Sequence, residues 1–272
     1  MSVLRIVLVV AVWLIIGILP ATLSAAENVR IPEGCKSIVY STNPQYPPYG
    51  WSVGEDRFDG AGIELLKMVL PPAISLKPVV YPWKRTLFLA EQGSIDLLVS
   101  LRVTPERSEY LTFTSHRAFP NPIVAFVRKD RKFAYKSWQD LKKHAGGISV
   151  GDTFGGGFDE FRRAELTIAE APTMRENFQK LDSGRIDYFI TSRYVGEAHL
   201  AQNPPAHEII ALSPSITNLD VHFGFSKRSA CAPLVQYVSR KLAELDSKGI
   251  SGKLLKKHLK RYKETSLSLI HI

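Results

Sequence analysis

Hydrophobic and polar positions follow two alternating patterns along most of the chain. Short apolar runs typical of buried strands alternate with segments whose apolar residues recur at helical spacing. In the segment 61–70, for example, Ile63, Leu66 and Leu70 share one helix face, and two prolines follow directly. Strand–helix–strand units in this order favour right-handed parallel crossovers. The pattern therefore predicts an α/β fold.

The pattern predicts the position of each element. Strands are expected at 37–42, 76–81, 96–101, 123–128, 148–151, 186–190 and 221–225. Helices are expected at 61–70, 83–92, 138–143, from 158 onward, and at 174–181, 194–201, 233–245 and 251–262. The extended segments 123–128 and 220–227 flank the second series of elements, so we expect them to cross a hinge. This arrangement predicts lobe one at 27–125 plus 222–262 and lobe two at 128–218, each with a mixed, mainly parallel sheet flanked by helices.

The first residues form a separate, strongly apolar stretch. Arg5 is followed by fourteen apolar residues at 6–19 and by small residues that include Ser24 and Ala26. A charged start, a short apolar core and small residues before a cut are typical of a secretory signal peptide. An uncleaved membrane anchor is the alternative, but a bilayer span needs about 20 residues. We therefore expect residues 1–26 to be removed and the mature protein to be soluble outside the cytoplasm.

The formal net charge of +9 reflects mainly the last helical segment. Six of its basic residues are Lys253, Lys256, Lys257, Lys260, Arg261 and Lys263. A solvated helix face explains this cluster better than nucleic-acid binding does in an exported protein. The segment 263–272 has no helical pattern and is expected to be a disordered tail. Its last six residues match what a common sequencing adapter would encode, so an assembly artefact is one interpretation of them.

Two cysteines, Cys35 and Cys231, lie outside the expected signal peptide. In an oxidising compartment such a pair is a candidate disulfide, which would tie the first strand to a late helix. Two separate thiols remain the alternative. Neither cysteine has a neighbouring Cys or His at metal-ligand spacing, so no metal site is expected.

Six short motifs occur in a fixed order along the chain. They are 43–49 (NPQYPPY), 59–65 (DGAGIEL), 81–87 (YPWKRTL), 93–96 (GSID), 103–107 (VTPER) and 181–188 (LDSGRIDY). In order and spacing they resemble the family 3 extracellular solute-binding proteins, the polar amino-acid receptors of ABC importers. Each motif alone is weak, and the combination is specific.

The resemblance implies a type II periplasmic-binding-protein fold, whose two α/β lobes close on a small ligand by hinge motion. It also implies a periplasmic location, a permease of the ABC type as partner, a monomer, and no cofactor. The ligand is expected to be a small polar molecule with a carboxylate, such as an amino acid or an analogue.

Arg107 carries the most specific part of the resemblance. It follows Thr104 and Pro105, which favour a helix start. In the family this arginine holds the ligand α-carboxylate, and a planar guanidinium suits such bidentate recognition. A surface ion pair of Arg107 with Glu106 or Glu109 is the alternative.

Other candidate ligand-binding residues surround this position in the resemblance. Ser100 and Arg102 correspond to positions that often hydrogen-bond the same carboxylate, although the receptors compared have a small hydroxyl in place of Arg102. Trp83, Tyr46 and Tyr49 are either aromatic walls of the site or core residues.

In lobe two, Thr153 and the glycines that begin at Gly155 precede a helix. Their backbone N–H groups are therefore candidates for binding an anion. A plain flexible turn is the alternative.

One position departs from the amino-acid receptors. These usually place an acidic residue five positions after the Asp of the Gly-Arg-X-Asp motif, where it pairs with the ligand ammonium. Counted from Asp187, that position is Ser192, which cannot neutralise a cation. Another carboxylate therefore substitutes, or the ligand is not a standard zwitterionic amino acid.

Two other functions remain open. Cyclohexadienyl dehydratases share the scaffold, and His116, Glu64 and Asp152 are candidates for acid–base chemistry. No nucleophile–base pair occurs at a recognisable spacing, so we expect a binding protein rather than an enzyme. A sensory or accessory binding protein without its own permease is the third interpretation.

Overall fold

The computed structural model describes residues 29–269 of the 272-residue chain. The expected signal peptide at 1–26 lies outside the described residues. The described elements belong to one compact unit that begins at Ile31. Within residues 29–269, no helix has both the length and the apolar character that a membrane span requires.

A five-stranded sheet forms the core of lobe one, with the strand order β5-β1-β6-β14-β7. Its strands are β1 (Ser37–Ser41), β5 (Ser75–Pro78), β6 (Leu97–Arg102), β7 (Leu111–Phe113) and β14 (Val221–Ser226). The helices around it are α1 (Ala61–Val69), α2 (Trp83–Glu91), α3 (Pro105–Tyr110) and α7 (Val235–Ser247). β6 lies at the centre of the sheet, and five of its six residues are buried. Its nearly continuous apolar sequence is what a strand covered on both faces requires.

A six-stranded sheet forms the core of lobe two, with the order β10-β9-β11-β8-β12 and β13 also paired with β8. Its strands are β8 (Pro122–Arg128), β9 (Ala145–Ser149), β10 (Thr167–Ala171), β11 (Tyr188–Ser192), β12 (Ile209–Ala211) and β13 (Thr217–Asn218). Its helices are α4 (Phe158–Glu165), α5 (Met174–Asp182) and α6 (Arg193–Gln202), with the short 3₁₀ turns η1 (Lys129–Arg131) and η2 (Trp138–Lys143).

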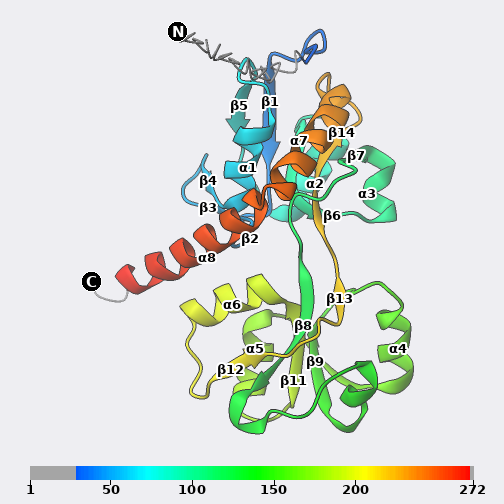
Figure 1. Ribbon diagram of the computed structural model, residues 1–272, viewed down its shortest axis with the longest axis vertical. Helices are drawn as coiled ribbons and strands as arrows, with labels where there is room; N and C mark the ends of the chain where they lie inside the picture. Colours follow the sequence, from blue (N-terminus) through cyan, green and yellow to red (C-terminus); the bar gives the residue numbers. More distant parts are fainter. Residues whose placement is uncertain (1–28, 270–272) are drawn as a thin grey trace, which may run out of the picture. The chain divides into compact units, whose positions relative to one another are not determined.

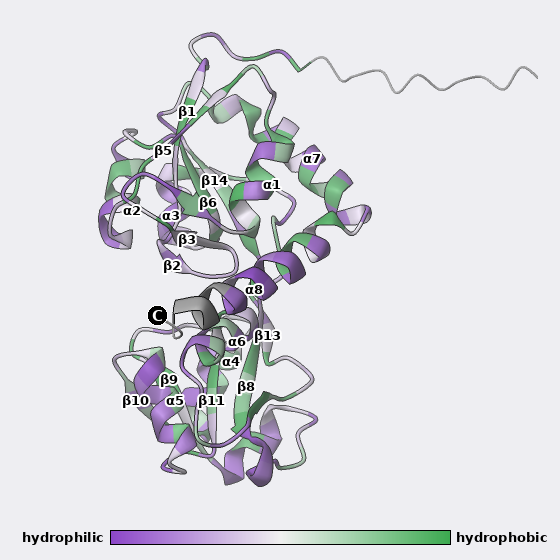
Figure 2. Cartoon of the chain, turned by 90° about the vertical axis from the view of Figure 1, so that its left-hand side faces the viewer, coloured by the Kyte–Doolittle hydropathy of each residue, from purple (hydrophilic) through white to green (hydrophobic). Residues whose placement is uncertain are grey.

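The residues of β8 alternate between two hydrophobic clusters. Ile123 and Ala125 belong to the cluster on one face of the sheet, whereas Val124 and Phe126 belong to the cluster on the other face. Successive side chains of a strand point to opposite faces, so one strand supplies both cores. Figure 2 shows the same division, because the strands are mainly hydrophobic and the outer helix surfaces are more hydrophilic.

Both sheets are mixed, as the sequence predicts, but neither is mainly parallel, because antiparallel pairs equal the parallel pairs in lobe one and outnumber them in lobe two. β1 pairs with β5 and β6 in parallel, and β9 pairs with β10 and β11 in parallel. The antiparallel pairs all involve β14 in lobe one and β8 in lobe two. These are the two segments that the pattern expects to cross between the lobes, and a crossing strand enters its sheet from the opposite direction.

The chain crosses between the lobes just before β8 and at the start of β14, so residues 123–125 belong to lobe two and not to lobe one as the sequence predicts. The two crossing segments, 119–121 and 219–221, are hydrogen-bonded to each other. The N–H of Leu219 donates to the carbonyl of Asn121 at 3.1 Å, and the N–H of Val221 donates to the carbonyl of Phe119 at 3.0 Å. Figure 1 shows these segments running side by side between the two sheets. They form the hinge of the two-lobed fold.

A small third sheet covers the segment after β1. It consists of β2 (Gln45–Tyr46), β3 (Gly50–Ser52) and β4 (Phe58–Asp59), which are antiparallel. The sequence pattern does not predict these strands, since two or three residues are too few to show an alternation. The pattern also does not predict β10, an edge strand with one buried residue.

The last helix, α8 (Ile250–Leu269), is longer than expected. Residues 263–269 are therefore helical rather than the disordered tail that the sequence predicts, and 270–272 lie outside the described residues. The segment contains Lys, Glu and Leu but no Gly or Pro, so nothing in its composition interrupts the helix. α8 packs against α1 and α7 of lobe one and against α6 of lobe two.

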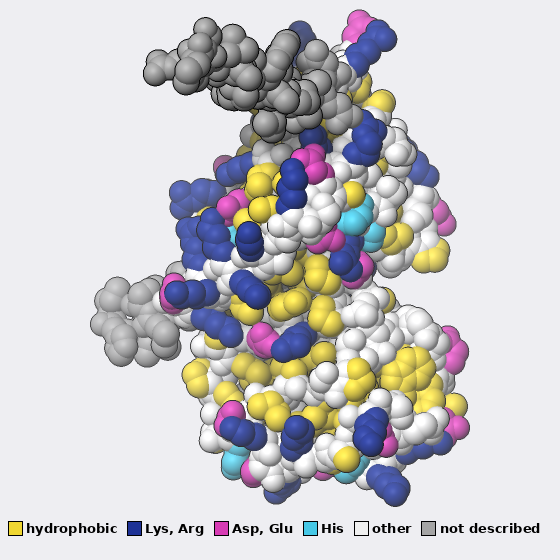
Figure 3. Space-filling view, viewed as in Figure 1, with side chains coloured by type: hydrophobic (Ala, Val, Ile, Leu, Met, Phe, Trp, Pro, Cys, Tyr) yellow, Lys and Arg dark blue, Asp and Glu magenta, His cyan; other side chains and the backbone are white. Residues whose placement is uncertain are grey.

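Near α6 and α8 the surface is partly apolar. A cavity of about 530 Å³ there has Trp51, Met174, Val195 and Tyr262 in its lining. Figure 3 shows hydrophobic side chains gathered across the middle of the face that Figure 1 presents.

Cys35 and Cys231 form a disulfide, with their Cα atoms 4.9 Å apart. The bond closes a loop of 196 positions and ties the chain just before β1 to the segment just before α7. The predicted pairing is thus confirmed, and the described residues contain no free cysteine.

Candidate functional site

Arg107 is positioned by the start of α3. Thr104 is the N-cap of this helix, and its Oγ1 accepts a hydrogen bond from the N–H of Arg107 at 3.3 Å. Pro105 occupies the first helical position, where its fixed φ favours the helix. The Arg107 side chain therefore leaves the backbone at a defined point at the edge of the sheet in lobe one.

The guanidinium of Arg107 is half-buried. Its Nη1 donates to the carbonyl of Arg102 at 2.9 Å, and its Cζ lies 5.7 Å from the centroid of the Trp83 ring. Burial, and next the positive charge of Arg102, lower the pKa of Arg107. None of the ion pairs in the described part of the chain involves Arg107, so the alternative of a pair with Glu106 or Glu109 is not observed.

Arg107 lines a cavity of about 100 Å³ on the lobe-one side of the cleft. The lining consists of Asn43, Tyr46, Trp83, Ser100, Leu101, Arg102 and Arg107. Five of the residues that the resemblance selects are thus brought together here. The set contains two cations, two aromatic rings and no acidic residue.

Ser100 has the unusual backbone of this site. Its φ is 56°, and no other non-glycine residue in the described part of the chain has a positive φ. The residue is 2% exposed, and its hydroxyl has no hydrogen-bond partner in the described structure. Strained conformations and unsatisfied buried polar groups concentrate at functional sites. The Ser100 hydroxyl also lies against Gly62 of α1, where an added Cβ would come within 2.3 Å of it.

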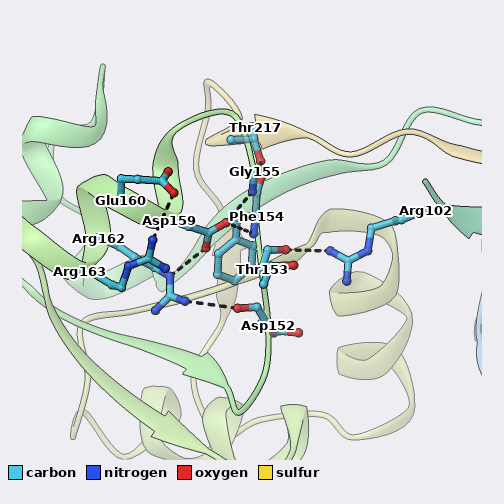
Figure 4. Close-up of polar contacts among 10 residues, drawn as sticks. All are labelled: Arg102, Asp152, Thr153, Phe154, Gly155, Asp159, Glu160, Arg162, Arg163 and Thr217. Carbon is cyan, nitrogen blue, oxygen red and sulfur yellow. Dashed lines mark hydrogen bonds and ion pairs between the residues drawn. The ribbon is translucent and has the colours of Figure 1, made fainter. Parts of the chain in front are cut away.

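Arg102 reaches from lobe one to lobe two. It is the last residue of β6, and its Nη1 donates to the carbonyl of Thr153 at 2.8 Å (Figure 4). Arg102 also lines a second, larger cavity of about 390 Å³, together with Thr153 and Gly155 of lobe two and Asp220 of the hinge. The arginine therefore lies between the two cavities and contacts both lobes.

The loop that contains Thr153 and Gly155 already binds a carboxylate of the chain itself. The N–H groups of Phe154 and Gly155 each donate to Oδ2 of Asp159 at 2.8 Å, and Oδ1 of Asp159 pairs with Arg162 at 3.0 Å. Figure 4 shows Asp159 against this loop. Of the N–H groups predicted to bind an anion, that of Gly155 is therefore taken by Asp159, because an acidic residue in the first turn of α4 lies within reach of the loop before it.

Tyr46 and Tyr49 lie in different environments. Tyr46 lines the small cavity, whereas the ring of Tyr49 is fully buried and stacks on Tyr46 with a centroid distance of 5.1 Å. Tyr49 thus follows the alternative of a core aromatic. Burial raises the pKa of both tyrosines, so both hydroxyls stay protonated at neutral pH.

Ser192 is buried at the end of β11. Its Oγ donates to Oδ1 of Asn121 at 2.5 Å, and Nδ2 of Asn121 donates to the hydroxyl of Tyr46 at 3.2 Å. Ser192 lines neither cavity. Asn121 and Asn43, which lines the small cavity, are the residues that the sequence reasoning does not select. A lone Asn between two prolines carries no recognisable motif, so Asn121 becomes visible only in the tertiary structure.

Two of the three candidates for acid–base chemistry are engaged elsewhere. His116 pairs with Asp246 of α7 at 3.0 Å, and Glu64 pairs with Lys257 and His258 of α8 at 2.7 and 2.8 Å. Neither residue lines the small or the larger cavity.

The third candidate, Asp152, precedes the bridging residue Thr153. Burial raises the pKa of Asp152, and the charge of Arg102 opposes that effect. Asp152 lines neither the small nor the larger cavity.

Comparison with solved structures supports the fold. An ancestral arginine-binding protein bound to arginine is 23% identical, with a TM-score of 0.59 over 82% of this chain and 97% of that chain. Substrate-binding domain 2 of GlnP from Lactococcus lactis, in an open conformation, is 17% identical, with a TM-score of 0.66 over 85% of this chain and 98% of that one. The ancestral amino-acid-binding protein AncCDT-1, a precursor of cyclohexadienyl dehydratase, is 22% identical, with a TM-score of 0.60 over 82% and 95%. At these identities the likeness shows the two-lobed fold alone.

The family follows from the sequence itself. No curated protein matches the chain. Residues 38–261 match the model of the bacterial extracellular solute-binding proteins, family 3, which is most of the chain and includes both sheets. The protein therefore belongs to the bacterial extracellular solute-binding proteins of family 3.

Proposed function

We propose that this protein captures a small carboxylate-bearing solute, such as an amino acid or an analogue, between its two lobes and delivers it to an ABC-type permease. The half-buried guanidinium of Arg107 is the observation that carries this proposal. It lies in the cleft without a carboxylate partner in the described structure, and burial lowers its pKa. A cation that is desolvated but not paired gains most from an anionic ligand.

The surroundings of Arg107 support bidentate recognition. One face of the guanidinium lies against Trp83, and Nη1 is held by the carbonyl of Arg102. A guanidinium has five N–H donors in a planar fork, so further donors remain for a carboxylate. Because two protein contacts already orient the group, little side-chain entropy is lost when the ligand binds.

The hinge supplies the motion that such capture needs. Two segments cross between the lobes, and closure around a ligand then requires dihedral changes at only a few residues of those segments. Arg102, which already contacts Thr153 across the cleft, is the side chain through which ligand binding and lobe closure are coupled.

The same proposal includes the cellular setting. Removal of residues 1–26 as a signal peptide places the mature chain in the periplasm, where the permease in the inner membrane is its partner. We propose a monomer that uses no cofactor or metal and that binds no nucleic acid. The disulfide Cys35–Cys231 agrees with an oxidising compartment.

Binding measurements on matched arginine variants test the proposal. The purified protein is screened by thermal shift and titration calorimetry against amino acids, amines and small carboxylates. A ligand at a hundredfold excess over its Kd stabilises the fold by about 2.7 kcal/mol. Arg107→Gln is expected to weaken carboxylate binding roughly tenfold or more, since charge-assisted hydrogen bonds contribute about 1.5–3 kcal/mol.

Arg85→Gln is the matched control. Arg85 also lies over an aromatic ring, that of Tyr81 at 5.0 Å, but it is exposed and lines neither the small nor the larger cavity. This variant is expected to bind as the unchanged protein does. Equal affinity in the Arg107 variant would contradict the proposed anchor.

We propose a binding role without catalysis, although AncCDT-1 is a precursor of an enzyme. The ion pairs that hold His116 and Glu64 outside the two cavities support this choice. Recovery of the bound compound unchanged after prolonged incubation, measured by NMR, is the expected result. Consumption of the compound would favour the dehydratase-like alternative.

A further inference from the structure

Two guanidiniums, those of Arg102 and Arg107, line the same cavity of about 100 Å³. Each donates to a backbone carbonyl, which is a neutral acceptor: Arg107 to Arg102, and Arg102 to Thr153. Neither takes part in an ion pair within the described part of the chain. The two charges repel each other: burial is the main cause that lowers the pKa of Arg107, and the charge of Arg102 is the second. Two adjacent cations without direct counter-ions leave room for two negative charges.

The acidic residues nearest to this pair do not fill that role. Glu106 and Asp152 act on Arg107 and Arg102 only through space, and neither lines the small cavity. Asp159 and Asp220 line the larger cavity and not the small one, and each is paired with an arginine, at 3.0 and 3.2 Å, although Oδ1 of Asp220 has no hydrogen-bond partner in the described structure. The cavity that holds both guanidiniums is therefore without a carboxylate of the protein.

A cationic group of a ligand finds no counter-charge at residue 192. Ser192 is buried, and its hydroxyl hydrogen is used in the bond to Asn121. Asn43, Tyr46 and Ser100 also line the cavity with polar side chains, and all three are uncharged. An ammonium group transferred from water into this cavity would lose hydration without forming an ion pair, which is unfavourable.

We propose that the ligand is a small dicarboxylate without an α-ammonium group, with one carboxylate bound by Arg107 and the other by Arg102. This inference rests on the proposed receptor function and names its substrate class. The cavity volume of about 100 Å³ is small, which favours a short chain of four or five carbons with two carboxylates over a larger ligand. Trp83 and Tyr46 supply the apolar contacts of that chain.

Arg102 is the residue that determines specificity in this arrangement. Its Nη1 is held by lobe two through Thr153, and the same side chain lines the cavity that contains Arg107, so its other N–H donors are available to the second carboxylate. The second carboxylate thus links the ligand to the lobe-closing contact. A monocarboxylate lacks this link, and an α-amino acid adds a charge of the wrong sign.

Calorimetry with matched compounds tests the proposal. The probes are succinate and glutarate, butyrate as the monocarboxylate of the same length as succinate, glutamate as the amino derivative of glutarate, and inorganic phosphate. We expect the dicarboxylates to bind at least roughly tenfold more tightly than butyrate and glutamate, which corresponds to about 1.4 kcal/mol. Phosphate is expected not to compete.

Two arginine variants separate the roles of the two cations. Arg102→Gln is expected to weaken succinate at least roughly tenfold more than it weakens butyrate, because only succinate loses a carboxylate contact in addition to the contact with Thr153. Arg107→Gln is expected to weaken the binding of both succinate and butyrate. Arg85→Gln serves as the control, and unfolding curves in urea confirm that each variant is folded.

Each other outcome overturns a specific statement. If glutamate or another amino acid binds more tightly and Asp152→Asn weakens it, the ammonium is held by Asp152 and the dicarboxylate proposal is wrong, while the Arg107 anchor stands. If phosphate competes with the dicarboxylates for binding, the proposed ligand class is wrong and the site binds a phosphate group. Binding of carboxylates that is insensitive to both arginine variants would refute the proposed function itself.

Discussion

Ser192 of lobe two donates a hydrogen bond of 2.5 Å to Oδ1 of Asn121 in the hinge. The amide of the same Asn121 donates to the hydroxyl of Tyr46 in lobe one, at 3.2 Å. The hydroxyl of Tyr49 lies 3.2 Å from Oδ1 and 2.9 Å from the carbonyl of Pro120. One hinge amide thus connects polar side chains of both lobes. Ser192, the position at which the resemblance leads us to expect an acidic residue, is thus a member of this network.

Replacement of the hinge amide should destabilise the fold. Asn121→Ala leaves the buried hydroxyl of Ser192 and the half-buried hydroxyl of Tyr46 without this partner, and an unsatisfied buried group costs about 1–3 kcal/mol. We expect the free energy of unfolding in urea to fall by about 2 kcal/mol or more. Asn218→Ala, at an exposed position of β13, is the control and should change it by less than about 0.5 kcal/mol. Equal losses in the two variants would show that the network contributes little.

The carboxylate of Asp159 should give lobe two a stability that depends on pH. Burial alone would raise its pKa, but the N–H groups of Phe154 and Gly155 and the guanidinium of Arg162 lower it overall. A folded pKa below the unfolded value of about 3.9 stabilises the fold above that pH, and the contribution is lost as the pH falls through the folded pKa. Asp159→Asn should therefore reduce the free energy of unfolding by about 2 kcal/mol at neutral pH.

Urea unfolding between pH 3 and pH 7 checks the sign of this effect. The difference between Asp159→Asn and the unchanged protein should narrow below about pH 4. Glu160→Gln is the matched control, because Glu160 is the exposed neighbour and pairs only with Arg163 on the surface. A difference that stays constant down to pH 3 would mean that the charge of Asp159 is not the cause.

Loss of the disulfide should cost more than any single side chain. The bond Cys35–Cys231 closes a loop of 196 positions, for which the chain-entropy model gives about 5 kcal/mol. The free energy of unfolding of the double variant Cys35→Ser, Cys231→Ser, measured in urea, should be lower by that amount. A reducing agent should destabilise the unchanged protein but leave the double variant unaffected. Two alkylatable thiols in the oxidised protein would contradict the pairing.

Gly62 should not tolerate a side chain. A Cβ at this position would lie 2.3 Å from Oγ of Ser100 and 2.9 Å from the carbonyl oxygen of Tyr49. Gly62→Ala should therefore destabilise the fold by about 1–3 kcal/mol and weaken ligand binding, since Ser100 lines the small cavity. Gly252→Ala is the opposite case, because nothing lies within 4 Å of its added Cβ in α8. That variant should stabilise the helix by about 0.5–1 kcal/mol.

The main elements and the two crossing segments follow from the order of residues. β6 and β8 contain enough consecutive apolar residues to be recognised, and α1 and α5 show their buried faces at helical spacing. Motif order also predicts Arg107, Arg102, Ser100 and Trp83, which the structure brings to one cavity. These features depend on local periodicity and on short motifs, and both are properties of neighbouring residues.

Other features depend on contacts between residues far apart in the chain. Asp159 takes the N–H of Gly155, one of those that a ligand anion was expected to bind, and Asn121 joins Ser192 to Tyr46. Tyr49 belongs to the core and Tyr46 to the cavity, although both stand in one loop. Local sequence carries no information on which polar group meets which partner, because that choice is made only when the two lobes and the hinge pack together.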